Sequence, residues 1–192
     1  VLTVIENKAP TAAISVPVAG EKYRAGEAIT FIGTGTDPED GTLGDAAFTW
    51  QIDLLRPGQS RPALAPIPGI KRGTFIPPDS GQEAEADVSY RFTLTVQDSM
   101  GATHAVSRDV LPQVSSFTLN SDPAGLELLL DSMPVLAPLA VQGVVGFKRT
   151  IGAAPTQTLN GTLYEFIGWS DGGAISHEIT TPGFPTTYLA TY

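Results

Sequence analysis

A strict alternation of apolar and polar residues between positions 88 and 97 is the strongest constraint on the fold. Because successive side chains of a β-strand point to opposite faces of the sheet, this pattern predicts a half-buried central strand. The inward-facing residues are Val88, Tyr90, Phe92, Leu94 and Val96, and the outward-facing residues are Ser89, Arg91, Thr93, Thr95 and Gln97.

A second run with the same period extends from Phe48 through Trp50 and Ile52 to Leu54. Trp50 shares the parity of its apolar neighbours, which predicts a place in the core rather than at a sugar-binding surface. The 20 Gly and 16 Pro residues favour many short strands joined by turns and disfavour long helices. With 42% hydrophobic residues, the chain can bury a core. We therefore predict an all-β fold.

The length of 192 residues is compatible with one large or two small domains. Leu111, Pro112 and Gln113 interrupt the pattern, and short apolar runs then start afresh. We predict two consecutive β-sandwich-like domains, at residues 1–112 and 113–192. In the second, strands are expected at 117–119, 126–130, 141–147, 164–169, 175–179 and 187–192, with turns at 121–125 and 131–134.

The net charge of −9 argues against nucleic acid as a partner, because phosphate binding requires clustered Lys and Arg. The absence of cysteine excludes disulfides, zinc–thiolate sites and thiol nucleophiles. No apolar run reaches the length of about 18 residues that a membrane span needs. Because the sequence starts at Val1 without a signal peptide, it is expected to be a piece of a longer protein.

Several motifs in residues 7–112 together resemble a PKD-type, immunoglobulin-like module of secreted bacterial proteins. The motifs are Asn7-Lys8-Ala9-Pro10, Gly26-Glu27, the Gly33–Gly41 segment GTGTDPEDG, Phe48-Thr49-Trp50 and the Leu94–Gly101 segment LTVQDSMG. The remainder, with Phe166–Gly173 and the closing Tyr188–Tyr192, is similar to small β-repeat modules that follow such domains. The family's Asp-Phe-Gly-Asp-Gly signature after the tryptophan is replaced here by Gln51–Leu55, and the histidines that relatives carry in the next loop are absent.

This resemblance implies a secreted, non-catalytic module attached to a catalytic domain or surface protein in the same parent chain. The leading functional hypothesis is an accessory module of a larger carbohydrate-active enzyme or sugar dehydrogenase that binds or positions polysaccharide. The alternative is a structural spacer or protein-interaction module, stiffened by calcium and without a glycan ligand.

The resemblance also implies a calcium site, because related domains bind Ca²⁺ through a lead-in Asn, an acidic turn and an Asp that ends a late strand. The matching positions here are Asn7, Asp37, Asp40 and Asp98, with Glu39 as a further candidate. Ca²⁺ prefers six to eight oxygen ligands, which carboxylates from separate turns of a sandwich can supply. The alternative is that Asp37-Pro38 and Asp40-Gly41 simply form turns through Asx hydrogen bonds.

The segment from Leu55 to Arg72 is rich in Pro and Gly and reads as a long structureless connection. One interpretation is a binding loop for an anionic or polyhydroxy ligand, with Arg56 and Arg61 as ligand-binding residues. The other is a crossover that proline stiffens.

Trp169 lies beside a Ser-Asp-Gly-Gly turn, where its ring could stack on a sugar, with Asp171 and Tyr164 as hydrogen-bonding partners. The alternative is that Trp169 fills a core, as large aromatic residues usually do. His104 and His177 are the only histidines, and neither lies in a recognisable catalytic or metal-binding spacing. We therefore expect no enzyme activity.

Overall fold

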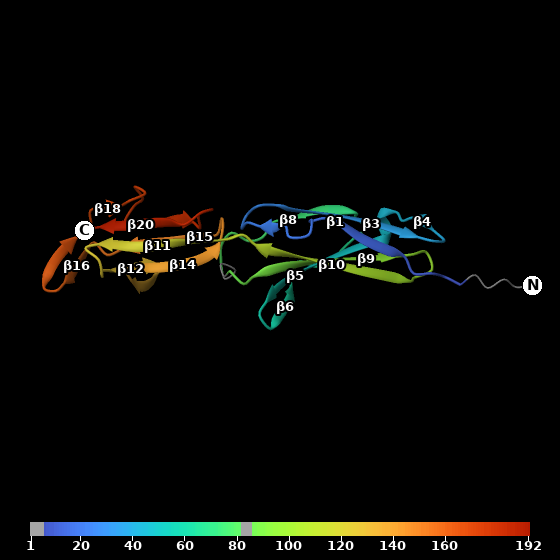
Figure 1. Ribbon diagram of the computed structural model, residues 1–192, viewed down its shortest axis with the longest axis horizontal. Helices are drawn as coiled ribbons and strands as arrows, with labels where there is room; N and C mark the ends of the chain where they lie inside the picture. Colours follow the sequence, from blue (N-terminus) through green and yellow to red (C-terminus); the bar gives the residue numbers. More distant parts are fainter. Residues whose placement is uncertain (1–5, 82–85) are drawn as a thin grey trace, which may run out of the picture. The chain divides into compact units, whose positions relative to one another are not determined.

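The computed structural model describes residues 6–81 and 86–192, and it is all-β as predicted (Figure 1). Within these residues the only helix is a 3₁₀ turn, Asp45–Ala47, and none is long and apolar enough to cross a membrane. The chain divides into two compact units. The first contains residues 6–23, 27–77 and 87–112, and the second contains residues 24–26, 78–81, 86 and 113–192.

The first unit contains two sheets. The smaller sheet consists of β1 (Thr11–Val16), β3 (Ile29–Asp37), β4 (Gly41–Thr42) and β8 (Arg72–Phe75). The larger sheet has the order β2 (Lys22–Tyr23), β10 (Thr103–Pro112), β9 (Ser89–Gln97), β5 (Phe48–Arg56) and β6 (Gln59–Pro62), and β7 (Ile67–Pro68) also pairs with β5.

The alternating runs of the sequence form the centre of the larger sheet. β9 pairs with β5 on one side and with β10 on the other, so its backbone is satisfied at both edges. Trp50 is fully buried, and its ring lies 4.8 Å from that of Phe31 on the smaller sheet. The predicted core role of Trp50 is thus confirmed, and the two sheets close on each other through aromatic contacts.

The glycines of the Gly-Thr-Gly-Thr segment explain how these large rings fit. Gly33 and Gly35 lie at inward positions of β3. A Cβ atom at Gly33 would collide with Leu94 and lie 3.0 Å from the Trp50 ring, while one at Gly35 would lie 3.2 Å from the Phe48 ring. The smaller sheet therefore needs residues without side chains opposite the aromatic residues of β5.

The interpretation of 55–72 as a structureless connection is wrong. β5 continues to Arg56, turns through Pro57-Gly58 and returns as β6, with Arg56 opposite Gln59 and Leu54 opposite Arg61. Gly58 has φ of 72°, the left-handed value that the second central residue of a type II turn requires after proline. The segment is a β-hairpin followed by the short strand β7.

The second unit contains two four-stranded sheets and a separate hairpin. One sheet has the order β14 (Leu139–Val144), β11 (Val114–Asp122), β20 (Thr186–Thr191) and β18 (Gly168–Trp169). The other has the order β13 (Met133–Leu136), β12 (Glu127–Leu130), β15 (Lys148–Ala153) and β19 (Ser176–Thr180), and β16 (Thr156–Leu159) pairs with β17 (Thr162–Glu165) in the hairpin.

Three strands of this unit were not predicted, namely β13, β15 and β16. β15 was missed because it begins with Lys148-Arg149-Thr150, although its Ile151 is fully buried between β12 and β19. The predicted strand at 164–169 is interrupted, since β17 ends at Glu165 and β18 begins at Gly168. The core of the unit combines residues of both sheets, including Phe117, Leu119, Leu128, Ile151 and Trp169.

Candidate functional site

The predicted calcium ligands come from three segments of the first unit that the fold brings together. Asn7 precedes β1, the acidic turn connects β3 to β4, and Asp98 directly follows β9. Asn7 Nδ2 donates a hydrogen bond of 2.8 Å to Asp98 Oδ2. Asp40 Oδ2 accepts from the Ser99 backbone N–H at 2.8 Å, and Asp40 Oδ1 lies 2.9 Å from Ser99 Oγ. We call this region, with Asn7, Asp37, Asp40 and Asp98, the acidic corner.

Asp37 is the buried member of the acidic turn, with 5% of its surface exposed. Its Oδ1 accepts the backbone N–H groups of Glu39 at 2.9 Å and Asp40 at 2.8 Å, as the Asx-turn interpretation predicts. Its Oδ2 is buried as well, and no donor within residues 6–81 and 86–192 reaches it. Turn formation therefore explains one oxygen of this carboxylate and leaves the other unexplained.

Asp98 is 7% exposed and organises the turn after β9. Its Oδ1 accepts the backbone N–H groups of Met100 at 2.9 Å and Ala102 at 2.8 Å. Burial raises the pKa of Asp98, but the hydrogen bonds from Asn7, Ala102 and Met100 lower it below its ordinary value. Asp98 is therefore held as a carboxylate at neutral pH.

The acidic corner differs from a preformed metal site in its ligand count. In the part of the chain that the structure describes, no three His, Cys, Asp or Glu side chains form a metal-binding group. Glu39 is exposed, and only its backbone N–H takes part in the turn. A cation held by Asp37 would need to draw its remaining oxygen ligands from Asp40, Asp98, the amide of Asn7, the backbone or water.

A depression of about 400 Å³ borders the corner and is lined by Asp40, Leu43, Asp98 and Ser99, among others. Ser99 contributes through its backbone and its hydroxyl group, and we had not identified it from the sequence. Its position directly after Asp98, at the start of a Ser-Met-Gly turn, was the available signal.

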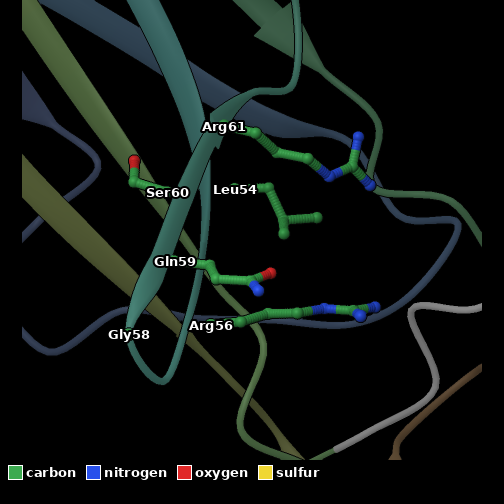
Figure 2. A pocket seen from close by; sticks show the side chains of 6 residues that line it. All are labelled: Leu54, Arg56, Gly58, Gln59, Ser60 and Arg61. Carbon is green, nitrogen blue, oxygen red and sulfur yellow. The ribbon is translucent and has the colours of Figure 1, made fainter.

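Arg56 and Arg61 project from the β5–β6 hairpin and line a second cavity of about 380 Å³ with Leu54, Gly58, Gln59 and Ser60. Figure 2 shows the side chains of Leu54, Arg56, Gln59 and Arg61 extending from the same side of the hairpin, while Ser60 points to the other side. The fold thus brings the two predicted arginines together. Gln59 was not predicted, although the Pro57-Gly58 dipeptide signals a turn that places it opposite Arg56.

The exposed platform that sugar stacking on Trp169 requires is not formed. Trp169 is 5% exposed, belongs to the core cluster and donates from Nε1 to the Ile175 carbonyl at 3.2 Å. The rings of Phe166 and His177 pack against it, with centroids 6.2 and 5.9 Å away. Tyr164 lies half-buried on β17, opposite Gln157. The indole ring thus lies in the core, as large aromatic residues usually do.

Asp171 is engaged within its own turn. Its Oδ1 accepts the Gly173 N–H at 3.1 Å, and its Oδ2 lies 3.0 Å from His177 Nε2. His177 Nδ1 in turn lies 2.7 Å from the Ala174 carbonyl. His104 belongs to the first unit, where its Nδ1 accepts the Ala12 backbone N–H at 2.9 Å. Both histidines therefore make structural hydrogen bonds.

No family model matches the chain, and no curated protein matches it by sequence. Among solved structures, the chain is similar to BcpA, the major pilin subunit of Bacillus cereus, with 12% identity and a TM-score of 0.37 over 96% of this chain and 71% of that chain. It is also similar to a Ca²⁺-stabilized adhesin with which an Antarctic bacterium binds ice, with 11% identity and a TM-score of 0.27 over 95% of this chain and 50% of that chain. Similarities at this level carry no argument about function.

Proposed function

We propose that this chain is a non-catalytic structural module of an extracellular protein, and that Ca²⁺ stabilises its first unit at the acidic corner. The observation that carries the proposal is the buried Oδ2 of Asp37, for which residues 6–81 and 86–192 supply no donor. A buried anionic oxygen without a partner costs free energy, and a bound cation removes that cost.

The neighbouring groups fit a hard cation. Asn7, Asp40 and Asp98 all present oxygen atoms, and carboxylate oxygens that accept one hydrogen bond retain a lone pair for a metal. The lowered pKa of Asp98 keeps this carboxylate charged in the absence of metal. A site with few charged ligands is expected to be weak, in the range of about 10⁻⁴ to 10⁻³ M that extracellular calcium modules show. An extracellular location, where calcium reaches such concentrations, would suit it.

The expectation of a non-enzyme is consistent with the use of both histidines in structural hydrogen bonds. Trp169 is buried and so offers no exposed ring on which a polysaccharide could stack. The β5–β6 hairpin remains the candidate surface for a glycan. The structural role therefore has the better support of the two functions predicted from the sequence. PKD membership and attachment to a catalytic domain of the parent chain remain part of this proposal.

Thermal unfolding in calcium and in chelator tests the role of the acidic corner. We expect Ca²⁺ to raise the Tm of the first unit. At a calcium concentration of about one hundred times Kd, the free energy of unfolding should increase by about 2.7 kcal/mol. Asp37→Asn retains an oxygen for the turn and removes the charge, so it should abolish this gain. Asp45→Asn is the matched control, because Asp45 is an exposed acid of the same unit whose side chain is 69% accessible.

The chain has two tryptophans, Trp50 in the first unit and Trp169 in the second. Fluorescence of a Trp169→Phe variant therefore reports unfolding of the first unit alone. Equal Tm values in calcium and chelator would disprove the proposal, as would a calcium gain that Asp37→Asn leaves unchanged.

A further inference from the structure

The two margins of the second unit differ in how they are closed. At one margin, the segment between β18 and β19 spans the two sheets, where Trp169 Nε1 donates to a carbonyl of this segment and Ser170 Oγ accepts the Leu189 N–H. The other margin is formed by β13 and β14, which are edge strands of the two sheets and are joined through Ala137-Pro138. Within residues 6–81 and 86–192, no strand pairs with the outer edge of β14.

The hydrogen bonds between β11 and β14 determine which backbone groups of β14 face this outer edge. The Val145 N–H donates to the Gln113 carbonyl at 2.9 Å, in register with the rest of the strand pair. Because bonded and non-bonded pairs alternate along antiparallel strands, the odd-numbered residues of β14 bond to β11. The N–H and C=O groups of Ala140 and Gln142 therefore point to the outer edge, and both residues are exposed.

β14 also lacks the features by which proteins protect an edge strand from further pairing. β13 contains Pro134, which has no N–H to donate, β18 is two residues long, and β19 carries His177 and Glu178. β14 contains no proline and no charged residue, and its pairing with β11 has no bulge. Residues 132–147, which include β13 and β14, contain no Asp, Glu, Lys, Arg or His. The edge of β14 is thus open to an added strand.

We propose that two copies of this chain associate by antiparallel pairing of their β14 edges about a two-fold axis at Val141. In this register, Ala140 of each copy lies opposite Gln142 of the other, and each such pair exchanges both N–H···O bonds. The edge is therefore self-complementary, as a two-fold interface requires. This match of hydrogen-bonding groups selects a second copy as the occupant of the edge.

Apolar side chains at the same margin favour this association. Val135, Leu139 and Val141 pack against the core of the unit but are only partly buried. On β13, Met133 and Leu136 are 66% and 68% exposed. Pairing of the β14 edges brings the margins of two units together, so that part of this apolar surface leaves water, and its removal from water stabilises the pair.

The charge of the chain sets the salt dependence of the association. Two copies that each carry a net charge of −9 repel each other at long range. The contact segment 132–147 is uncharged, so salt screens the repulsion without weakening the contact, with a Debye length of about 8 Å at 0.15 M salt. Because a single short strand forms a small interface, we expect a weak dimer that becomes tighter as the salt concentration rises.

Sedimentation velocity of the 192-residue chain at concentrations up to about 1 mM tests the proposal. We expect a dimer whose affinity increases between about 0.01 M and about 0.15 M salt. Gln142→Pro removes the outward N–H and leaves the bonds to β11 in place, and proline is tolerated in edge strands. This variant should weaken dimerisation at least about tenfold. Gln142→Ala is the matched control, because it shortens the same side chain but keeps the N–H, and it should leave the affinity unchanged.

Amide hydrogen exchange followed by NMR identifies the surface without any substitution. The N–H groups of Ala140 and Gln142 should exchange rapidly in dilute protein and more slowly as the concentration rises, while the Val141 N–H, bonded to β11, should be protected throughout. Circular dichroism establishes that each variant is folded, and if Gln142→Pro is not, the exchange measurement decides. A chain that stays monomeric at about 1 mM would overturn the proposal. So would dimerisation that leaves the exchange of Ala140 and Gln142 unchanged, or that a folded Gln142→Pro variant retains in full.

Discussion

Two aspartate turns, one in each unit, share a hydrogen bond from a backbone N–H to the aspartate Oδ1 and differ in what faces the second carboxylate oxygen. In the first unit, Asp37 Oδ1 accepts N–H groups two and three residues ahead, and in the second unit Asp171 Oδ1 accepts the N–H two residues ahead. The second oxygen of Asp171 lies 3.0 Å from His177 Nε2. The second oxygen of Asp37 is buried and meets no donor within residues 6–81 and 86–192.

The difference shows why the acidic residues of this chain cannot be interpreted alike. Both ring nitrogens of His177 lie within hydrogen-bond distance of an oxygen atom, Nε2 of the Asp171 carboxylate and Nδ1 of the Ala174 carbonyl. The turn of the second unit thus contains a side-chain partner for the second oxygen of Asp171. Among residues 6–81 and 86–192 no side chain does the same for the buried oxygen of Asp37, and this difference is the reason for proposing a cation from the solvent there.

Trp169→Ala should have the largest effect, because it removes a buried indole on which the Asp171–His177 turn packs. Loss of a large core aromatic costs about 3–5 kcal/mol, which should unfold the second unit near room temperature or lower its Tm by more than 10 °C, to judge from about 4–8 °C per kcal/mol. Denaturant unfolding followed by far-UV circular dichroism measures the loss, and Trp50 fluorescence, which reports the first unit, is the internal control. A variant of unchanged stability would show that Trp169 is dispensable for the core.

His177→Gln should have an intermediate effect and should make the second turn resemble the first. The variant loses a partly buried, charge-assisted bond, and such bonds contribute roughly 1.5–3 kcal/mol. Burial raises the pKa of Asp171, but bonds from Gly173 and His177 lower it below the ordinary value. We therefore expect the pKa of Asp171 to rise in the variant, as measured by NMR titration of the carboxyl carbon. An unchanged pKa would contradict the pairing.

Period-two patterns predicted the central strands of the first unit, but they did not predict every strand of the two units. β9 and β5 are long and apolar on one face, so the alternation alone identified them. β15 was not predicted because Ile151 is its single large inward residue. The strand is held in place by pairing with β12 and β19 and not by an apolar pattern of its own. The β5–β6 hairpin was not predicted because the Pro and Gly residues were interpreted as irregular structure. The dipeptide Pro57-Gly58 is also typical of a tight turn.

The candidate sites show a similar division. The meeting of Asn7 with Asp98 and of Asp40 with Ser99 follows from the topology of a sandwich, in which these three segments reach one end. Whether an oxygen is left without a donor depends on side-chain geometry, and no sequence pattern encodes it. The burial of Trp169 likewise depends on Phe166 and His177, which come from different parts of the second unit.

Asp109→Asn should have the smallest effect on stability, because it removes an exposed ion pair and not a partly buried one. Asp109 binds Arg91 in a two-bond pair at 2.7 and 2.8 Å, shorter than the His177 pair, but the two side chains are 41% and 46% exposed. Water screens such pairs, so the expected loss of stability is below about 1 kcal/mol.

The Arg91 hydrogen bond lowers the pKa of Asp109 despite partial burial. The contribution is therefore present above the unfolded-state pKa of about 3.9 and is lost as the pH falls through the lower folded-state pKa. Denaturant unfolding of both proteins at neutral and acidic pH measures the difference, which should shrink towards zero in acid. A loss comparable to that in His177→Gln would show that exposure does not rank these pairs.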